Sequence, residues 1–329
     1  LEDGGFRYTT TLLGLTSDEE APVILQLLDS SGAKLEEQRV IVQAGRLDMV
    51  LPPVTTTARA GSLDGFLLTS FLYEPSAAVV LNTEGVPVWA VEGREGALIS
   101  ETRLHPDGGE ILYCEYGLGD GTEVDEQSQI VRVDLRSVEQ TRQHAPGLHH
   151  DFVVLPDGVV AYLSHDRRQA GGEWVLGDAI MELSEDGALV EVWSAWDTLP
   201  YTEETPSESM GWTHANALVY DPDEQAYYVS LYNYNAILKV CRQTGGVEWI
   251  LGGPLSDFAL SDDDAFLHQH NFQLLDDDRI LLFDNGPQGV RETEALEIAL
   301  DTTAMTAEVV WRYQPEDAVN TLVFGDVER

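Results

Sequence analysis

The chain has 329 residues, 43% of them hydrophobic, which is enough apolar material to bury a sizeable core. Acidic residues outnumber basic ones by 58 to 18, and the formal net charge of −40 argues against a nucleic acid or an anionic membrane as partner. No run of 18 or more apolar residues occurs, so the sequence predicts no membrane span. The acidic residues are spread along the chain, which is typical of a highly solvated surface.

Residues 1–50 contain three apolar segments that we expect to be β-strands: Phe6–Leu13, Val23–Asp29 and Lys34–Val42. Two interpretations of this N-terminal part stay open. In the first, Leu1–Gly4 (LEDG) resumes a turn motif found in the rest of the chain, and the three strands complete its last repeat. In the second, residues 1–50 form a small immunoglobulin- or fibronectin-like module. Both interpretations assign the main domain to residues 51–329.

After residue 50 the chain reads as short strands separated by turn residues, with almost no helical periodicity. Val153–Asp166 shows the repeating unit: a strand ends in Leu-Pro-Asp-Gly, and a second strand returns. Ala179–Ser184 and Ala188–Ser194 supply a third and a fourth strand. Similar turns recur at Ser62–Gly65, His105–Gly108, Leu155–Gly158, Tyr220–Asp223 and Asp276–Asp278, and a closing aromatic recurs as Trp89, Trp193, Trp249 and Trp311.

The first strand of each unit starts five or six residues before its turn motif. Successive starts lie 43 to 64 residues apart, at Thr57, Ser100, His150, His214, His270 and Gly325. Units of four strands with a repeated turn and a repeated aromatic are typical of a β-propeller. We therefore predict an all-β fold, a six-bladed β-propeller with four-stranded antiparallel blades.

Three histidines occupy the same predicted position in three consecutive units: His150, His214 and His270. In a propeller this position lies near the axis, so the three imidazoles are expected to lie close together. A single histidine of this kind is more often a hydrogen-bonded core residue. Three in register favour a functional site, because burying three polar rings without a purpose costs free energy three times over.

The second strand of each unit ends on the face where the first strand begins, so its last residues belong to the same predicted site. We expect Asn216 and Tyr232 to act with the histidines in catalysis. Amide and guanidinium groups on the same face can orient the oxygens of a substrate. The candidate substrate-binding residues are Asn271, Asn233, Asn285, Arg167 and Arg291.

Four segments resemble the bacterial aryl-sulfate sulfotransferases: His149–Gly158 (HHDFVVLPDG), Trp212–Val219 (WTHANALV), Val247–Gly253 (VEWILGG) and Gln269–Gly286 (QHNFQLLDDDRILLFDNG). The resemblance implies a six-bladed propeller, usually with an added N-terminal β-module. It also implies an extracytoplasmic location, which is the periplasm, the cell surface or the medium. The implied reaction needs no nucleotide sulfate donor: a histidine takes a sulfuryl group from a phenolic sulfate and passes it to a phenol.

Position by position, the resemblance implies that His270 is transiently sulfated and that His214 and His150 support it. The chemistry suits imidazoles, since a neutral ring nitrogen is a good nucleophile near pH 7 and a second ring can move the proton. The resemblance implies an arginine 18 residues after the histidine matched by His214. The sequence departs from the family there, because this residue is Tyr232. A second family arginine corresponds to Glu294. An arginine would bind sulfuryl oxygens in a bidentate manner, whereas tyrosine offers one neutral donor.

Two other functions stay open. The sulfotransferase interpretation needs no cofactor, but loss of the arginine would also suit a metal-dependent enzyme in which His150, His214 and His270 bind one divalent transition metal. Alternatively, the protein is a non-enzymatic extracellular binding or assembly protein. An incomplete last blade would expose an edge strand, and a second copy could complete it to give a homo-oligomer. In either enzymatic interpretation the partner is a small phenolic or sulfated molecule.

Overall fold

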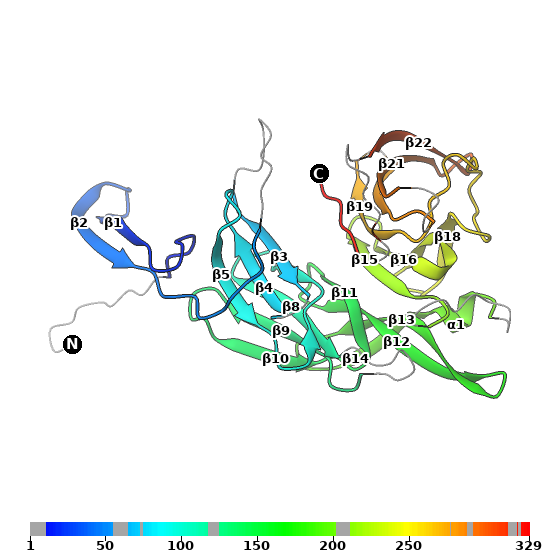
Figure 1. Cartoon of the computed structure of the whole chain (residues 1–329), viewed down its shortest axis with the longest axis horizontal. Coiled ribbons are helices and arrows are strands. Elements are labelled where there is room, and N and C mark those ends of the chain that lie inside the picture. Colours follow the sequence, from blue (N-terminus) through cyan, green and yellow to red (C-terminus); the bar gives the residue numbers. More distant parts are fainter. Residues whose placement is uncertain are drawn as a thin grey trace. The chain divides into compact units, whose positions relative to one another are not determined.

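The computed structural model describes residues 11–54, 65–72, 75–117, 125–201, 211–276, 278–287, 292–314, 321 and 324–329. Within these residues nearly all regular structure is β-strand, and antiparallel sheets follow one another along the chain (Figure 1). The fold is an all-β propeller of antiparallel sheets, as the sequence repeats predicted. The chain divides into two compact units, Leu1–Tyr113 with Arg132–Thr141 and Cys114–Val131 with Arg142–Arg329.

The N-terminal strands form a two-stranded antiparallel sheet from β1 (Glu20–Leu28) and β2 (Lys34–Gln43), which confirms two of the three strands expected there. Most of the third, Phe6–Leu13, lies outside the described residues. Among the described residues, β1 and β2 pair only with each other. Whether residues 1–50 close a blade or form a separate module stays a prediction.

Two sheets of the repeat follow. The first has the order β3 (Leu67–Phe71), β4 (Ala77–Leu81), β5 (Pro87–Glu92). Its expected first strand at Thr57 lies outside the described residues. The strands of the second sheet are β6 (Ala97–Leu98), β7 (Thr102–Leu104), β8 (Glu110–Gly117), β9 (Gln129–Asp134) and β10 (Gln140–His144). Because β6 and β7 both pair with β8, they together take the place of one first strand.

Three four-stranded sheets complete the described repeats, and in each the strands pair in chain order. The first contains β11 (Leu148–Val154), β12 (Val160–Ala170), β13 (Glu173–Leu183) and β14 (Leu189–Ser194). The second contains β15 (Ala215–Asp221), β16 (Ala226–Leu231), β17 (Ala236–Cys241) and β18 (Val247–Leu251). The third contains β19 (His270–Leu275), β20 (Arg279–Asp284), β21 (Glu294–Asp301) and β22 (Thr306–Tyr313). The helical pieces are α1 (Ala195–Thr198) and the 3₁₀ turn η1 (Tyr232–Tyr234).

The described residues form five sheets of the repeat type, so the prediction of six blades is wrong for this part of the chain. The sixth blade was expected to begin at Gly325, but residues 324–329 contain no strand. Side chains hold this segment instead: Asn271 Nδ2 donates to Asp326 Oδ1 at 2.6 Å, and the backbone N–H of Arg329 donates to Gln273 Oε1 at 3.0 Å. The terminal segment therefore docks against β19 without a backbone ladder. Completion of a blade by a second copy stays a prediction.

The described turns and closing aromatics of the repeat lie at the predicted places in the sheets. The turn Leu155–Gly158 joins β11 to β12, with the backbone N–H of Gly158 donating to the carbonyl oxygen of Leu155 at 2.9 Å. The closing aromatics all lie on the last strand of a sheet: Trp89 on β5, Trp193 on β14, Trp249 on β18 and Trp311 on β22. In the described residues this turn therefore joins the first two strands of a blade, and the tryptophans mark the last strand.

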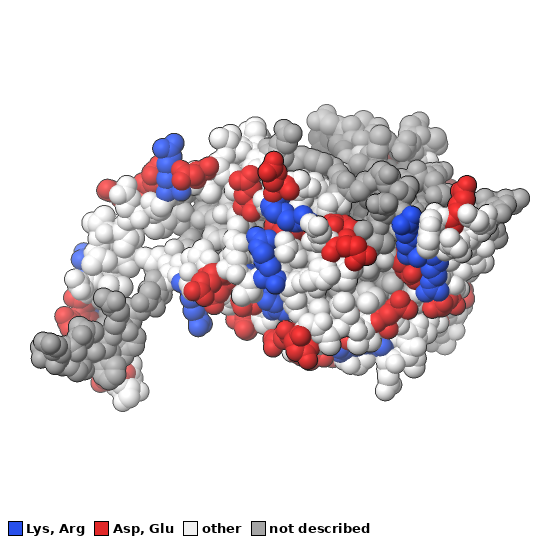
Figure 2. All heavy atoms as spheres, turned by 90° about the horizontal axis from the view of Figure 1, so that it is seen from below, with Lys and Arg blue, Asp and Glu red and all other residues white. Residues whose placement is uncertain are grey.

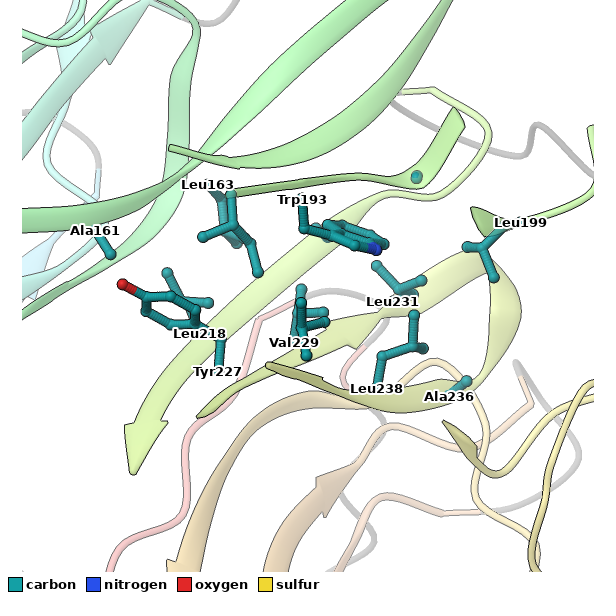
Figure 3. Packing of buried hydrophobic residues seen from close by; sticks show 14 of the residues in the cluster. Ala161, Leu163, Trp193, Leu199, Leu218, Tyr227, Val229, Leu231, Ala236 and Leu238 are labelled. Carbon is teal, nitrogen blue, oxygen red and sulfur yellow. The ribbon is translucent and has the colours of Figure 1, made fainter. Parts of the chain in front are cut away.

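A large apolar core lies between the sheet β11–β14 and the sheet β15–β18 (Figure 3). Leu163 of β12 and Trp193 of β14 face Val229 of β16, and all three are buried. Burying a side chain of this size contributes roughly 1.5–3 kcal/mol relative to leaving it exposed. The sheet β15–β18 is apolar on both faces, because one face contributes to this core and the other to a second core with the sheet β19–β22.

Acidic and basic side chains are dispersed over the face drawn in Figure 2 rather than gathered in one cluster. This agrees with the even spread of acidic residues in the sequence. No helix among the described residues is long and apolar enough to cross a membrane.

Candidate active site

His150 lies on β11, His214 directly precedes β15 and His270 is the first residue of β19, so each marks the start of a sheet. The rings of His150 and His214 are 5.0 Å apart between centroids. Tyr232 lies between the other two histidines, at 4.9 Å from His214 and 5.3 Å from His270. These four residues, called the histidine cluster below, form a continuous row of rings.

The register of the three histidines differs by one residue from the predicted register. Asn216 and Asn271 are each the one unpaired residue of a β-bulge, since the pairings on either side of them skip that residue. His270 directly precedes Asn271, whereas the residue before Asn216 is Ala215 and His214 lies one position earlier. The row of rings is nevertheless continuous, because the bulges and the backbone at the strand starts re-aim the side chains.

Two of these histidines have an unusual backbone conformation. The φ angles of His150 and His214 are 54° and 51°, in the left-handed region that residues with a Cβ rarely occupy. Holding a side chain there costs of order 1 kcal/mol or more for each residue, and such residues persist where the surrounding structure enforces them. The conformation is therefore consistent with a functional requirement at both positions.

A fixed amide determines the proton position on His270. Its Nδ1 lies 2.8 Å from Asn285 Oδ1. The other side of that amide, Nδ2, faces only acceptors or hydroxyls: the carbonyl oxygens of Thr321 and Phe324 and the hydroxyl of Thr321, at 2.9–3.1 Å. Because Nδ2 must donate to them, Oδ1 is the atom that accepts, and His270 carries its proton on Nδ1. Nε2 is then the unprotonated nitrogen.

Burial sets the charge of these rings. It lowers the pKa of His150 well below that of a free imidazole, and the rings of His149, His214 and His270 lower it further. Burial also lowers the pKa of His270. It lowers the pKa of His165, whose ring stacks on His149 at 3.9 Å, to about 3. All three rings are neutral at pH 7, so each keeps one nitrogen lone pair.

The model of the arylsulfotransferase (ASST) family matches residues 74–328, which is more than half of the chain. The chain belongs to the arylsulfotransferase family. No curated protein matches the sequence. Solved structures with some similarity include a protein from Lactobacillus plantarum, with 16% identity over 94% of this chain and 81% of that one and a TM-score of 0.45. A putative exported protein from Bacteroides fragilis has 11% identity over 93% and 78% and a TM-score of 0.42.

Tyr232 stands at the position where the resemblance implies an arginine. The tyrosine lies in η1, where its backbone N–H donates to the carbonyl oxygen of His214 at 3.0 Å. Its ring also stacks on His268, with centroids 4.6 Å apart. Gly253 contributes to this turn, because a Cβ there would lie 2.0 Å from the carbonyl oxygen of Tyr234. Glu294, at the second arginine position, accepts a bond from Arg312 at 2.9 Å.

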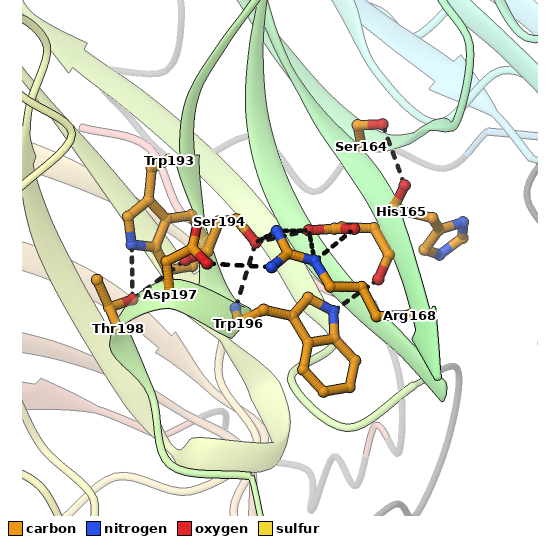
Figure 4. Close-up of polar contacts among 9 residues, drawn as sticks. Ser164, His165, Arg168, Trp193, Ser194, Trp196, Asp197 and Thr198 are labelled. Atoms are coloured by element: carbon orange, nitrogen blue, oxygen red, sulfur yellow. Dashed lines mark hydrogen bonds and ion pairs between the residues drawn. The ribbon is translucent and has the colours of Figure 1, made fainter. Parts of the chain in front are cut away.

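The predicted arginines lie elsewhere on the sheet β11–β14 or outside the described residues. The guanidinium of Arg167 lies 4.7 Å above the ring of Trp174. Arg168 is held by Asp166, Asp197 and Ser194, in the network drawn in Figure 4. Arg291 lies outside the described residues. His165, Arg167 and Trp174 line an open cavity of about 650 Å³ on this sheet.

The predicted amides are bonded within the protein. Asn216 Nδ2 donates to the carbonyl oxygen of Gln269 at 2.7 Å, and Asn233 Nδ2 donates to that of Gly211 at 2.9 Å. Asn271 binds Asp326, as described above, and Asn285 binds His270. In this structure these asparagines position the strand starts and the histidine, and a direct role in substrate binding stays a prediction.

Sequence reasoning missed Asp178 of β13, a buried carboxylate beside the histidines. Its Oδ2 accepts bonds from the hydroxyl of Thr213 and from the backbone N–H of Ala215, the latter at 2.6 Å. Burial raises the pKa of this carboxyl, but the nearby imidazoles of His149 and His165 and the hydrogen bond from Thr213 outweigh it, and the pKa is lowered overall. An aspartate within an otherwise apolar strand was the signal that could have identified it.

The structure does not gather the predicted metal ligands. Among the described residues, one group of three offers ligand atoms within 4.8 Å of one another, and it consists of His149, His165 and Asp178. The three predicted ligands, His150, His214 and His270, are not such a group, since Tyr232 lies between two of them. A metal-dependent reaction therefore has a different candidate site from the one expected.

Proposed function

We propose that this protein transfers a sulfuryl group from a phenolic sulfate to a phenol through His270, without a nucleotide sulfate donor. Membership of the arylsulfotransferase family supports the reaction class. The observation that carries the role of His270 is its bond to Asn285, because the orientation of that amide leaves Nε2 unprotonated. Burial keeps the ring neutral, and a neutral imidazole is a competent nucleophile near pH 7.

The reaction has two displacement steps. First, the lone pair of His270 Nε2 attacks sulfur, a nitrogen–sulfur bond forms, and the sulfur–oxygen bond breaks with its electron pair leaving on the phenolate. The sulfated ring is a cation, and its Nδ1–H bond to Asn285 Oδ1 stabilises that charge. Second, an acceptor phenol gives its proton to a neighbouring imidazole and attacks sulfur. The nitrogen–sulfur bond then breaks with its electron pair returning to Nε2, and the neighbouring imidazole releases its proton to solvent, which protonates the phenolate set free in the first step.

His150 and His214 are the proposed acid–base groups, because they continue the row of rings from His270 through Tyr232. The Tyr232 hydroxyl is the proposed donor to a sulfuryl oxygen, in place of the family's arginine. One neutral hydrogen bond stabilises such an oxygen less than a bidentate guanidinium does, so we expect slow turnover. The family resemblance also supports an extracytoplasmic location, which fractionation of the source cells would test.

The test is turnover of 4-nitrophenyl sulfate with phenol as acceptor, followed by mass spectrometry of the acid-quenched protein. We expect a sulfuryl adduct on the peptide that contains His270 when the donor is present alone. His270→Ala should abolish both the adduct and turnover. His105→Ala, at a hairpin turn in the other unit, is the matched control. A His270 variant with wild-type rates would refute the histidine intermediate.

A metal-dependent enzyme is the second candidate function, and the closeness of His149, His165 and Asp178 is the observation that favours it. Elemental analysis of the purified protein tests it. About one transition metal per chain, lost together with activity on chelation, would support this candidate.

A further inference from the structure

Three buried groups lie in a line that ends at the histidine cluster. Asp178 Oδ1 is 3.1 Å from His149 Nε2, and His149 Nδ1 is 2.8 Å from His150 Nδ1. The carboxylate and the His149 ring are almost fully buried. The first contact is at ion-pair distance but lacks the alignment of a full hydrogen bond.

We propose that Asp178, His149 and His150 form a relay that keeps His150 Nε2 unprotonated and takes up the proton that His150 removes from the acceptor. Asp178 and His149 are positioning residues in this relay, since they act through His150. The base role of His150 rests on the proposed function, whereas the proton positions rest on the geometry alone.

The proton positions follow from the acceptors. The ionised Asp178 carboxylate can only accept, so His149 carries its proton on Nε2. Its Nδ1 is then an acceptor, and the 2.8 Å contact requires a proton on His150 Nδ1. A neutral imidazole carries one ring proton, so His150 Nε2 keeps its lone pair.

The relay also moves the positive charge that His150 would carry after taking a proton to a position where a carboxylate compensates it. A positive charge on this ring is disfavoured, because the rings of His149 and His214 each lie 5.0 Å from it between centroids. When Nε2 receives a proton, the Nδ1 proton can move to His149 Nδ1. His149 then becomes an imidazolium next to the Asp178 carboxylate, where the charge is compensated. The reverse movement returns the Nδ1 proton to His150, and Nε2 then releases the acceptor's proton to solvent, so the relay is unchanged after each cycle.

The geometry fits a relay better than a metal site at the same residues. The rings of His149 and His165 stack 14° from parallel with centroids 3.9 Å apart, so their in-plane lone pairs run side by side and do not converge on one point. Asp178 Oδ2 is also already occupied by Thr213 and Ala215.

The decisive variant is Asp178→Asn. The bonds from Thr213 and Ala215 require an oxygen acceptor at the Oδ2 position, so the new NH₂ group must face His149. His149 Nε2 then has to accept, its proton moves to Nδ1, and His150 acquires its proton on Nε2. An asparagine in place of the buried aspartate of a Ser-His-Asp triad acts in this way, keeping the geometry but giving the wrong tautomer.

The primary measurement is the ¹⁵N NMR spectrum of the full chain labelled at histidine, with His150 assigned by mutation. We expect His150 Nε2 to be unprotonated in the wild type and protonated in Asp178→Asn. The matched control is Asp166→Asn, which removes the same charge from a carboxylate on the neighbouring strand β12 that accepts bonds from Arg168 and Ser194. It should leave the His150 tautomer unchanged.

Activity gives the second measurement. We expect Asp178→Asn to lower kcat by about 10²-fold or more with KM changed little. We also expect the plot of kcat against the deuterium fraction of the solvent to be curved in the wild type and linear in the variant. An unchanged His150 tautomer in this variant would overturn the relay, as would Zn²⁺ shifting the signals of His149 and His165 together. If Asp178→Asn changes the His150 tautomer but the wild-type protein transfers no sulfuryl group, the proton positions of the relay are retained and the proposed function is refuted.

Discussion

The ring of Tyr232 stacks on the ring of His268, with centroids 4.6 Å apart and planes 18° from parallel. A flat guanidinium stacks on aromatic rings in the same manner. The position at which the resemblance implies an arginine is therefore occupied here by a group of similar shape but without the charge.

Replacing Tyr232 tests how much the missing charge matters. We expect Tyr232→Arg to raise the rate of sulfuryl transfer or leave it unchanged, because it restores a bidentate donor for sulfuryl oxygens. Tyr232→Phe keeps the ring and the stacking but removes the hydroxyl, and should lower kcat. Initial rates with 4-nitrophenyl sulfate provide the comparison. A Phe variant that is as fast as the wild type would exclude the hydroxyl as a donor.

Asn285 should control the nucleophile without touching the substrate. Asn285→Ala removes the acceptor that fixes the proton on His270 Nδ1, and we expect kcat to fall by roughly 10–10²-fold. Asn285→Asp keeps an acceptor toward His270 and should retain more activity than the alanine variant. The yield of sulfated His270 measured by mass spectrometry distinguishes a weaker nucleophile from weaker donor binding. Equal yields in both variants would contradict the positioning role.

His214 is the proposed acid–base group nearest to Tyr232. His214→Ala should reduce turnover by about 10²-fold or more. Because the φ angle of this residue is 51°, His214→Asn is the better matched variant, since asparagine tolerates this conformation. Both should lose activity, while the asparagine variant should unfold at the higher temperature. Thermal denaturation and initial rates together separate the two effects.

Lowering the pH should affect stability before it affects the chemistry. The pKa of His165 is about 3 in the folded chain and 6.5 for the free side chain, so between these values the unfolded chain binds a proton that the folded chain does not. Stability must therefore fall as the pH drops below 6.5, by up to roughly 1.4 kcal/mol per pH unit for each such group. His165→Phe should flatten this dependence in thermal denaturation series. Because burial also lowers the pKa values of His150 and His270, kcat should begin to fall at a lower pH than it would with free imidazoles.

Metal removal separates the two enzymatic proposals. If sulfuryl transfer proceeds as proposed, exhaustive chelation should leave both the rate and the unfolding temperature unchanged. If a metal is required, chelation should lower both, and His149→Ala should lower the metal content more than His270→Ala does. Elemental analysis before and after dialysis provides the measurement.

The repeat was predictable because each blade must turn and close in the same way. The Asp-Gly turns and the tryptophans Trp89, Trp193, Trp249 and Trp311 lie where the periodicity put them. The count of six failed at the C-terminus, where the apparent repeat from Gly325 onward lacks a backbone ladder. Sequence spacing carries no information on whether such a segment pairs through its backbone or is held by side chains such as Asn271.

The site was predictable only in part, for a related reason. Spacing placed His150, His214 and His270 together, but it did not show that His214 lies one residue further from its β-bulge than His270 does, because bulges leave no regular signal. Asp178 was missed because it lies on β13, two strands away from His149 in the same sheet, and sequence spacing does not show which residues of β11 and β13 approach each other.

The left-handed backbone at His150 and His214 has a consequence for how this protein can be engineered. Glycine would occupy both positions without strain, so a selection for thermal stability alone would favour discarding the two side chains proposed to move protons. Variants chosen in this way should unfold at a higher temperature and lack sulfuryl-transfer activity. Stabilising changes are better sought in the apolar core between the sheets β11–β14 and β15–β18.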